Sequence, residues 1–245
     1  MAKTEGPAFY ASGERSTWRD VRAILHPPYT AWHLSYVVLG AMVVRHVNWT
    51  TLLATLLAFF LAVGVAAHAL DELRGRPLST ALSSRLLGVS AALGLGGAVA
   101  IGVAGVTRVG AGLLVFIVVG AFFVLAYDLE LFGGLVHTDL GFALSWGAFP
   151  VLTSAYAQTS TLSWSALLLA LSASLLSSAQ RNLSNPVRAL RRRVTSVEGE
   201  ITFADAHVQK IDRSFLLEPS ERALRSMSLA MMALAVAFVL VRRGH

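Results

Sequence analysis

The sequence contains no cysteine, and this absence excludes several kinds of chemistry at once. Without thiols the chain can form no disulfide, no thiolate-ligated iron–sulfur cluster and no cysteine nucleophile. Charged residues are also scarce, at 14% of 245 residues, whereas soluble domains carry about 25%. Hydrophobic residues make up 55% of the chain. The composition therefore predicts an integral membrane protein.

The start of the chain lacks the short basic and apolar run of a secretory signal. Residues 1–28 are polar with scattered aromatic residues, and we expect them to form a cytoplasmic N-terminal segment. Residues 29–245 then form a single transmembrane helical domain with a basic, amphipathic cytoplasmic loop at 180–225. Within this loop the composition of 188–193 predicts a helix. The mixture of apolar residues and acids at 200–213 predicts a surface helix.

Long apolar runs predict an all-α protein with about seven transmembrane helices, because a helix needs about 17–25 apolar residues to cross a bilayer. These runs are residues 30–46, 50–69, 86–106, 109–127, 140–158, 162–179 and 226–241. Gly110 and Gly112 separate the third run from the fourth and predict a tight hairpin. Pro150 predicts a kink in the fifth, since it removes a backbone hydrogen bond. The small residues of 91–105 suit close helix packing in lipid.

The charges are distributed unevenly about this seven-span arrangement. The side of the N-terminus receives 16 of the 20 basic residues and all 14 acids. Those basic residues are Lys3, Arg15, Arg19, Arg22, Arg74, Arg76, Arg85, Arg181, Arg188, Arg191, Arg192, Arg193, Lys210, Arg213, Arg222 and Arg225, and the opposite side holds Arg45, Arg108, Arg242 and Arg243. By the positive-inside rule we expect a prokaryotic-type inner-membrane protein with a cytoplasmic N-terminus and an external C-terminus. The net charge of +6 lies where it favours lipid headgroups or phosphates rather than nucleic acid as the partner.

Titratable side chains cluster at the cytoplasmic ends of the predicted helices. His68 and Glu72 are four residues apart and so share one helix face. Ionisable groups at membrane depth usually face a cavity and a partner. The groups that could meet there are His33, His68, Asp71, Glu72, Asp128, Glu130, His137, Asp139 and Arg181. The pattern predicts a functional site at this face.

One chemistry that fits is Mg²⁺-assisted handling of a phosphorylated lipid. Mg²⁺ is bound through one or two carboxylates plus substrate phosphates, and the guanidinium fork matches phosphate oxygens. In this interpretation the metal-side catalytic carboxylates are Asp71, Glu72 and Asp139, and the phosphate contacts are Arg74, Arg76, Arg181 and Arg188.

A second chemistry is a mononuclear or dinuclear site for iron, manganese or zinc. Mixed imidazole and carboxylate ligands from facing helices are typical of di-iron bundles. Its ligands would be His33, His68, Glu72, Glu130 and His137, with Asp71 beside them. The histidines favour this chemistry and the arginines favour the first.

Several phrases resemble the UbiA-type intramembrane prenyltransferases. Residues 25–40 resemble the first span of that family, and Asp71-Glu72 with Arg76-Pro77-Leu78 resembles its first Asp-rich motif. Residues 133–158 resemble its fourth-to-fifth span phrase. The resemblance implies a UbiA-like bundle with a cytoplasmic-side cavity for an isoprenoid diphosphate and Mg²⁺. The chain departs from the family in several places: His68 stands where Asn is usual, Arg76 stands where a further acid is expected, and residues 180–185 have no carboxylate in place of the second motif. The family usually has about nine spans, whereas seven are predicted here.

Three functional hypotheses follow. The first is a prenyltransferase-like membrane enzyme that acts on an isoprenoid or other lipid with a divalent metal. The second is a non-haem metal oxidoreductase that uses the histidine and glutamate ligands. The third is a non-catalytic lipid-binding subunit.

Overall fold

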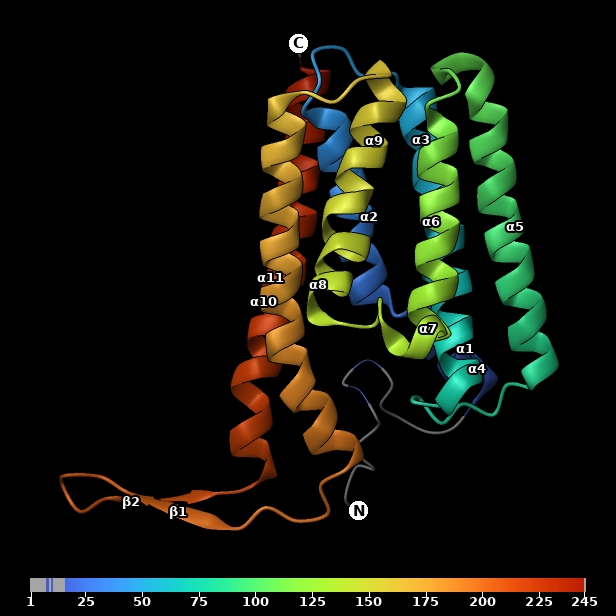
Figure 1. Cartoon of the computed structure of the whole chain (residues 1–245). Helices are drawn as coiled ribbons and strands as arrows, with labels where there is room; N and C mark the ends of the chain where they lie inside the picture. Colours follow the sequence, from blue (N-terminus) through green and yellow to red (C-terminus); the bar gives the residue numbers. More distant parts are fainter. Residues whose placement is uncertain (1–7, 9, 11–15, 245) are drawn as a thin grey trace.

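The computed structural model describes residue 8, residue 10 and residues 16–244. The chain is mostly helical, at 78%. The helices are α1 (Thr17–Leu25), α2 (Pro27–Met42), α3 (Trp49–Phe59), η2 (Phe60–Ala67), α4 (His68–Gly75), α5 (Ser84–Val109), α6 (Leu113–Asp128), α7 (Leu131–Gly134), α8 (Asp139–Phe142), η3 (Ala143–Ala148), α9 (Phe149–Thr159), α10 (Trp164–Arg192) and α11 (Arg213–Arg243). Two strands, β1 (Gly199–Thr202) and β2 (Val208–Ile211), form an antiparallel hairpin. Figure 1 shows the long helices side by side in one bundle.

Three helices are long and apolar enough to cross a membrane among the residues described. They are Trp49–Gly75, Ser84–Val109 and Arg213–Arg243, and Leu113–Asp128 is a shorter apolar helix. A helix of 27 residues such as Trp49–Gly75 extends about 40 Å at 1.5 Å per residue, more than the ~30 Å hydrocarbon core. These helices support the predicted membrane protein, and each of the seven predicted runs falls largely within a helix.

Two of the long helices contain a π-helical stretch. Helices α3, η2 and α4 are consecutive and form one rod, and α8, η3 and α9 form another. Pro150, at which the sequence predicts a kink, lies in the first turn of α9 directly after η3. Single π-helical turns inside α-helices occur frequently at functional sites. Here both lie near the middle of the bundle.

Small residues allow the backbones to approach closely. A Cβ atom added at Gly40 of α2 would lie 2.4 Å from the carbonyl oxygen of Val151 in α9. At Gly94 the added atom would lie 2.7 Å from the carbonyl oxygen of Leu61. The small-residue packing predicted for 91–105 is therefore confirmed at Gly94, and van der Waals contact replaces the hydrophobic effect in lipid.

The region 180–225 differs from its predicted form. Helix α10 continues to Arg192, as the helix predicted at 188–193 requires, but the surface helix predicted at 200–213 is wrong. Gly199 pairs with Ile211 and Thr202 with Val208 in a β-hairpin. β-Branched residues concentrate in these two strands, and they favour a pleated backbone over a helix.

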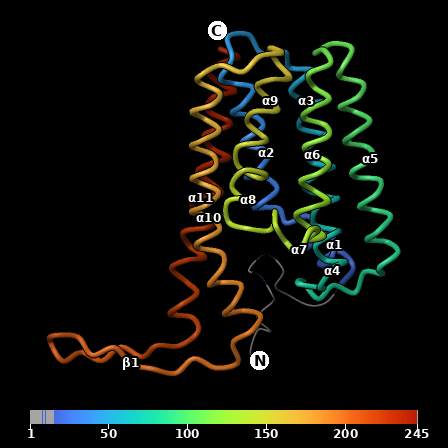
Figure 2. Tube along the Cα trace, in the orientation of Figure 1, coloured from blue at the N-terminus to red at the C-terminus, as the bar shows by residue number. Residues whose placement is uncertain are grey.

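Figure 2 shows α10 and α11 running together past the ends of the other helices to this hairpin. We call this projection the arm. It is closed by an ion pair in which Arg191 Nε donates to Glu221 Oε1 at 2.5 Å, with both side chains 9% exposed.

The charges separate along the bundle as the sequence indicates. Arg242 of α11 donates hydrogen bonds to the carbonyl oxygens of Met42 and Val44. The C-terminal end of α11 lies at the same end of the bundle as the α5–α6 turn (Figure 1). Helices α1, α4 and α7 lie at the opposite end (Figure 1), which we call the polar end. Of the N-terminal segment predicted at 1–28, residues 1–7, 9 and 11–15 lie outside the described residues, as do Lys3 and Arg15 of the predicted charge pattern.

Candidate functional site

At the polar end, the α1–α2 junction and three helix ends bring ionisable side chains together. We call this group the end cluster and define it as His26, His68, Asp71, Asp128, Arg188 and Arg192. His68 and Asp71 come from α4, Asp128 from the last position of α6, and the two arginines from α10. The cluster thus combines imidazoles, carboxylates and guanidinium groups from four parts of the chain.

His26 occupies the junction between α1 and α2. Its φ of 45° is left-handed, and its N–H bonds to the carbonyl oxygen of Ala23 to end α1. The Tyr10 hydroxyl lies 2.8 Å from Nε2 of the ring. Burial lowers the pKa of His26 well below its usual value, and His68 lowers it further. The ring is therefore neutral at physiological pH.

His68 stacks on His26. The ring centroids are 4.4 Å apart and the ring planes differ by 26°. His68 begins α4 directly after the π-helical stretch η2, and its Nδ1 donates to the carbonyl oxygen of Gly64 at 3.4 Å. This leaves Nε2 as the hydrogen-bond acceptor of a neutral ring. His26 and His68 thus place a proton-accepting nitrogen atom at the polar end.

Asp71 and Asp128 lie close enough for their charges to interact. Asp128 is 9% exposed, and its Oδ2 is buried without a hydrogen-bond partner among the described residues. Asp71 is exposed, and the charges that act on it include Arg192 and Arg188. A buried carboxylate oxygen normally has a hydrogen bond, a cation or a proton. Asp128 is therefore the least satisfied polar group of the cluster.

Glu72 faces the chain that follows α4. It is fully buried, its Oε2 accepts from the Leu78 N–H at 2.9 Å, and its Oε1 accepts from the N–H and hydroxyl of Thr80 at 2.9 and 2.8 Å. Arg76 supports the same connection by donating to the carbonyl oxygen of Leu82 at 2.5 Å. The predicted catalytic and metal-binding Glu72 thus stabilises the turn at 77–80.

Four other predicted residues form two ion pairs around α6. Arg74 bonds to Glu130 at 2.9 Å and also to the carbonyl oxygen of Leu129. Arg181 donates to Asp139 and to the Tyr127 hydroxyl. These contacts hold the α6–α8 connection against α4 and α10.

Of the predicted phosphate contacts, Arg74, Arg76 and Arg181 therefore bond within the protein. Arg188 is exposed and donates to Asn185, one turn earlier on α10. It is the one of the four that belongs to the end cluster.

The remaining predicted histidines pack against aromatic rings. His33 is 6% exposed, and its Nδ1 donates to the carbonyl oxygen of Trp146 at 2.9 Å. His137 stacks on Tyr127 at 4.4 Å, and its Nδ1 donates to the Tyr127 carbonyl oxygen at 3.0 Å.

The predicted transition-metal ligands have separate partners. Glu72 bonds to the turn at 77–80, Glu130 to Arg74, and His33 to Trp146. In the part of the chain that the structure describes, no group of three or more His, Cys, Asp or Glu side chains is arranged to hold a metal ion. The end cluster instead contains two carboxylates whose charges interact, those of Asp71 and Asp128.

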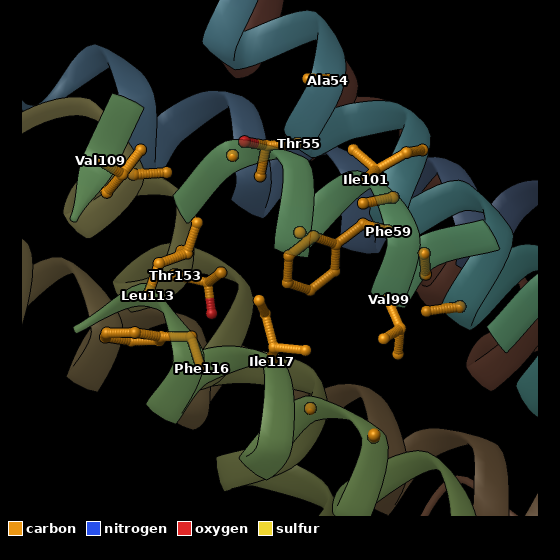
Figure 3. A pocket seen from close by; sticks show the side chains of 18 of the residues that line it. Ala54, Thr55, Phe59, Val99, Ile101, Val109, Leu113, Phe116, Ile117 and Thr153 are labelled. Carbon is orange, nitrogen blue, oxygen red and sulfur yellow. The ribbon is translucent and has the colours of Figure 1, made fainter. Parts of the chain in front are cut away.

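An apolar cavity of about 430 Å³ lies in the bundle, and its lining extends from Arg108, at the end opposite the end cluster, to Trp146. Helices α3, α5, α6, η3 and α9 contribute its walls. Figure 3 shows Phe59 of α3 and Phe116 and Ile117 of α6 projecting into it. The volume is in the range of small-molecule pockets, about 300–1,000 Å³.

Trp146 connects the cavity to the polar end. Its side chain lines the cavity, its carbonyl oxygen accepts from His33, and its ring lies 5.7 Å from that of Tyr127. Tyr127 in turn bonds to Arg181 and precedes Asp128. One aromatic layer thus separates the cavity from the end cluster.

Sequence reasoning did not include His26, and it placed Asp128 at the predicted site without giving it a role. Histidine at the residue before two prolines gave a local signal, because it stands between two helices. Asp128 gave another signal as the acid that ends an apolar run. No sequence signal marks the cavity, since it depends on which helices become neighbours.

Comparison of the chain with protein-family models, with curated proteins and with solved structures finds no match. The UbiA-type resemblance therefore stays a prediction from the sequence.

Proposed function

We propose that this protein is a membrane-embedded, UbiA-like enzyme that acts on a phosphorylated isoprenoid or a similar lipid. The lipid chain occupies the apolar cavity, and its head group lies at the end cluster. The observation that carries the proposal is Asp128, whose buried Oδ2 has no hydrogen-bond partner among the described residues, in range of Asp71. Arg188 and Arg192 of α10 act on Asp71.

The two carboxylates fit a divalent cation such as Mg²⁺. Mg²⁺ uses few protein carboxylates and completes its shell with water and substrate phosphates. Asp71 and Asp128 would hold it, and an orphaned buried oxygen is the feature such an ion satisfies. When bound, the ion neutralises charge that develops on a departing phosphate group.

The other residues of the cluster bind and orient the substrate. Arg188 and Arg192 supply guanidinium donors for phosphate oxygens. His26 presents a neutral ring stacked on that of His68, and a neutral imidazole accepts a proton from a reacting hydroxyl or carbon acid. The chain and the head group would join beside Trp146, which lines the cavity and contacts Tyr127.

We also propose seven membrane crossings with the polar end in the cytoplasm and the C-terminus outside. The overlap of all seven apolar runs with helices supports this count. The segregation of Arg45, Arg108, Arg242 and Arg243 from the acids supports the orientation.

The geometry favours this function over the two others. A non-haem oxidoreductase would need His33, His68, Glu72, Glu130 and His137 around one metal, whereas the contacts above separate them. A non-catalytic lipid-binding subunit would use the cavity alone, and it leaves Asp128 unexplained.

The test is binding of geranylgeranyl diphosphate to the purified full-length chain in nanodiscs, with and without Mg²⁺. We expect Mg²⁺-dependent binding that Asp71→Asn and Asp128→Asn each weaken by about tenfold or more. Asp205→Asn, a matched change in the hairpin, should leave binding intact. The absence of binding at any Mg²⁺ concentration would overturn the proposal.

A further inference from the structure

Two hydroxyl groups on the wall of the apolar cavity have no hydrogen-bond partner among the described residues. Ser145 lies in η3 and Thr153 two turns later in α9, and both line the cavity. The Oγ of Ser145 and the Oγ1 of Thr153 are buried and unpaired. Figure 3 shows the Thr153 side chain between Leu113, Phe116 and Ile117.

Other hydroxyls of the same cavity are satisfied by their own helix. Thr55 donates to the carbonyl oxygen of Thr51 at 2.8 Å, and Thr107 donates to that of Ala104 at 3.1 Å. This back-bonding is the usual arrangement for Ser and Thr inside a helix. Ser145 and Thr153 depart from it where solvent does not reach them. A buried hydroxyl without a partner is costly, and most have one.

We infer that the cavity takes a lipid with neutral carbonyl oxygens, such as a quinone or a diester, and that Ser145 and Thr153, which lie two turns apart, each donate a hydrogen bond to a different one. This inference rests on the proposed function in one respect, namely that a lipid chain enters the cavity. A plain hydrocarbon would leave both hydroxyls unpaired. Among the described residues that line the cavity, Arg108 alone is charged, and the rest of the wall is apolar or carries hydroxyl groups, which favours a neutral group on the lipid.

The site offers a matched control on the same helix. Ser154 is fully buried and its hydroxyl is also unpaired, but it faces α2, where its Cβ lies 3.1 Å from the position of a Cβ added at Gly40. It does not belong to the cavity lining. The Ser154→Ala variant therefore loses a buried hydroxyl group while the cavity lining stays the same.

Trp146 provides the readout because it lines the cavity and bromine quenches indole fluorescence on contact. The purified full-length chain in nanodiscs is titrated with methyl 9,10-dibromostearate and with 9,10-dibromooctadecane, which differ in the ester. The quenching assigned to Trp146 is the part lost in Trp146→Phe. We expect the ester to bind about 2- to 12-fold more tightly for each hydrogen bond gained.

A single ester carbonyl reaches one of the two hydroxyls, so the preference should approach one in either Ser145→Ala or Thr153→Val, and also in the double variant. Ser154→Ala should keep it. Because each change removes an unpaired hydroxyl, the melting temperature should not fall. Equal binding of ester and alkane by the unmodified chain would overturn the carbonyl inference while leaving the lipid cavity in place. No quenching of Trp146 by either probe would overturn the carbonyl inference and the lipid cavity together.

Discussion

Replacement of Glu72 by glutamine separates a turn-stabilising role from a catalytic one. The carboxylate is fully buried and accepts three hydrogen bonds, two from Thr80 and one from Leu78. The glutamine side chain has one acceptor oxygen and one NH₂ group. The NH₂ group therefore faces an N–H or O–H donor that the carboxylate of Glu72 satisfies. One buried donor left unpaired costs about 1–3 kcal/mol. At about 2–4 °C per kcal/mol for a chain of this size, we expect the melting temperature to fall by about 2–12 °C.

The assay is thermal unfolding of the full chain in detergent, measured alongside Asp71→Asn. Asp71 is the neighbouring acid and is exposed, so its replacement should change the melting temperature by less than about 1 °C. Thr80→Val removes one of the three donors of Glu72 and should lower the temperature as well. An unchanged melting temperature in Glu72→Gln, together with lost Mg²⁺-dependent binding, would refute the turn-stabilising role and return Glu72 to the metal site.

Two further predictions concern stability. Because burial lowers the pKa of His26 in the folded chain, His26 takes up its proton at a higher pH in the unfolded chain than in the folded one. The contribution of His26 to the free energy of unfolding is therefore present above pH 6.5 and is lost as the pH falls below it. The melting temperature should fall between pH 7.5 and 5, and His26→Asn, whose side chain tolerates the positive φ, should flatten that slope; a slope of equal size in the variant contradicts this account. Gly40→Ala places a methyl group 2.4 Å from the carbonyl oxygen of Val151 and should destabilise the chain by about 1–3 kcal/mol. Gly96→Ala, with open space around it, should not, and equal melting temperatures for the two variants would contradict the close approach.

The sequence was sufficient to predict where the long apolar helices lie, because the length of an apolar run determines them. Each predicted run from 30–46 to 226–241 falls largely on a helix, and Gly110 and Gly112 do lie at the α5–α6 turn. The hairpin at 199–211 was predicted wrongly, because its charges also suit an amphipathic helix. Only the β-branched residues Ile201, Thr202 and Val208 distinguish the two.

The candidate site was predictable as a location but not as a set of contacts. The sequence places ionisable groups at the polar end, and the structure brings His68, Asp71 and Arg188 into one cluster there. It cannot show that Glu72 bonds to Thr80, because the path of the chain after α4 decides that contact. Nor can it show which hydroxyls stay unpaired, since pairing depends on backbone geometry within η3 and α9.

The arm has a practical consequence for imaging. Small membrane proteins such as this one, at 26.1 kDa, carry little mass outside the bilayer by which particles are aligned. Helices α10 and α11 hold the hairpin away from the bundle, and the turn between its strands, at residues 203–207, is exposed. Exposed hairpin tips tolerate inserted domains. A compact domain inserted there would be fixed at two points to a helical support, and so would give a rigid landmark without touching the cavity or the end cluster.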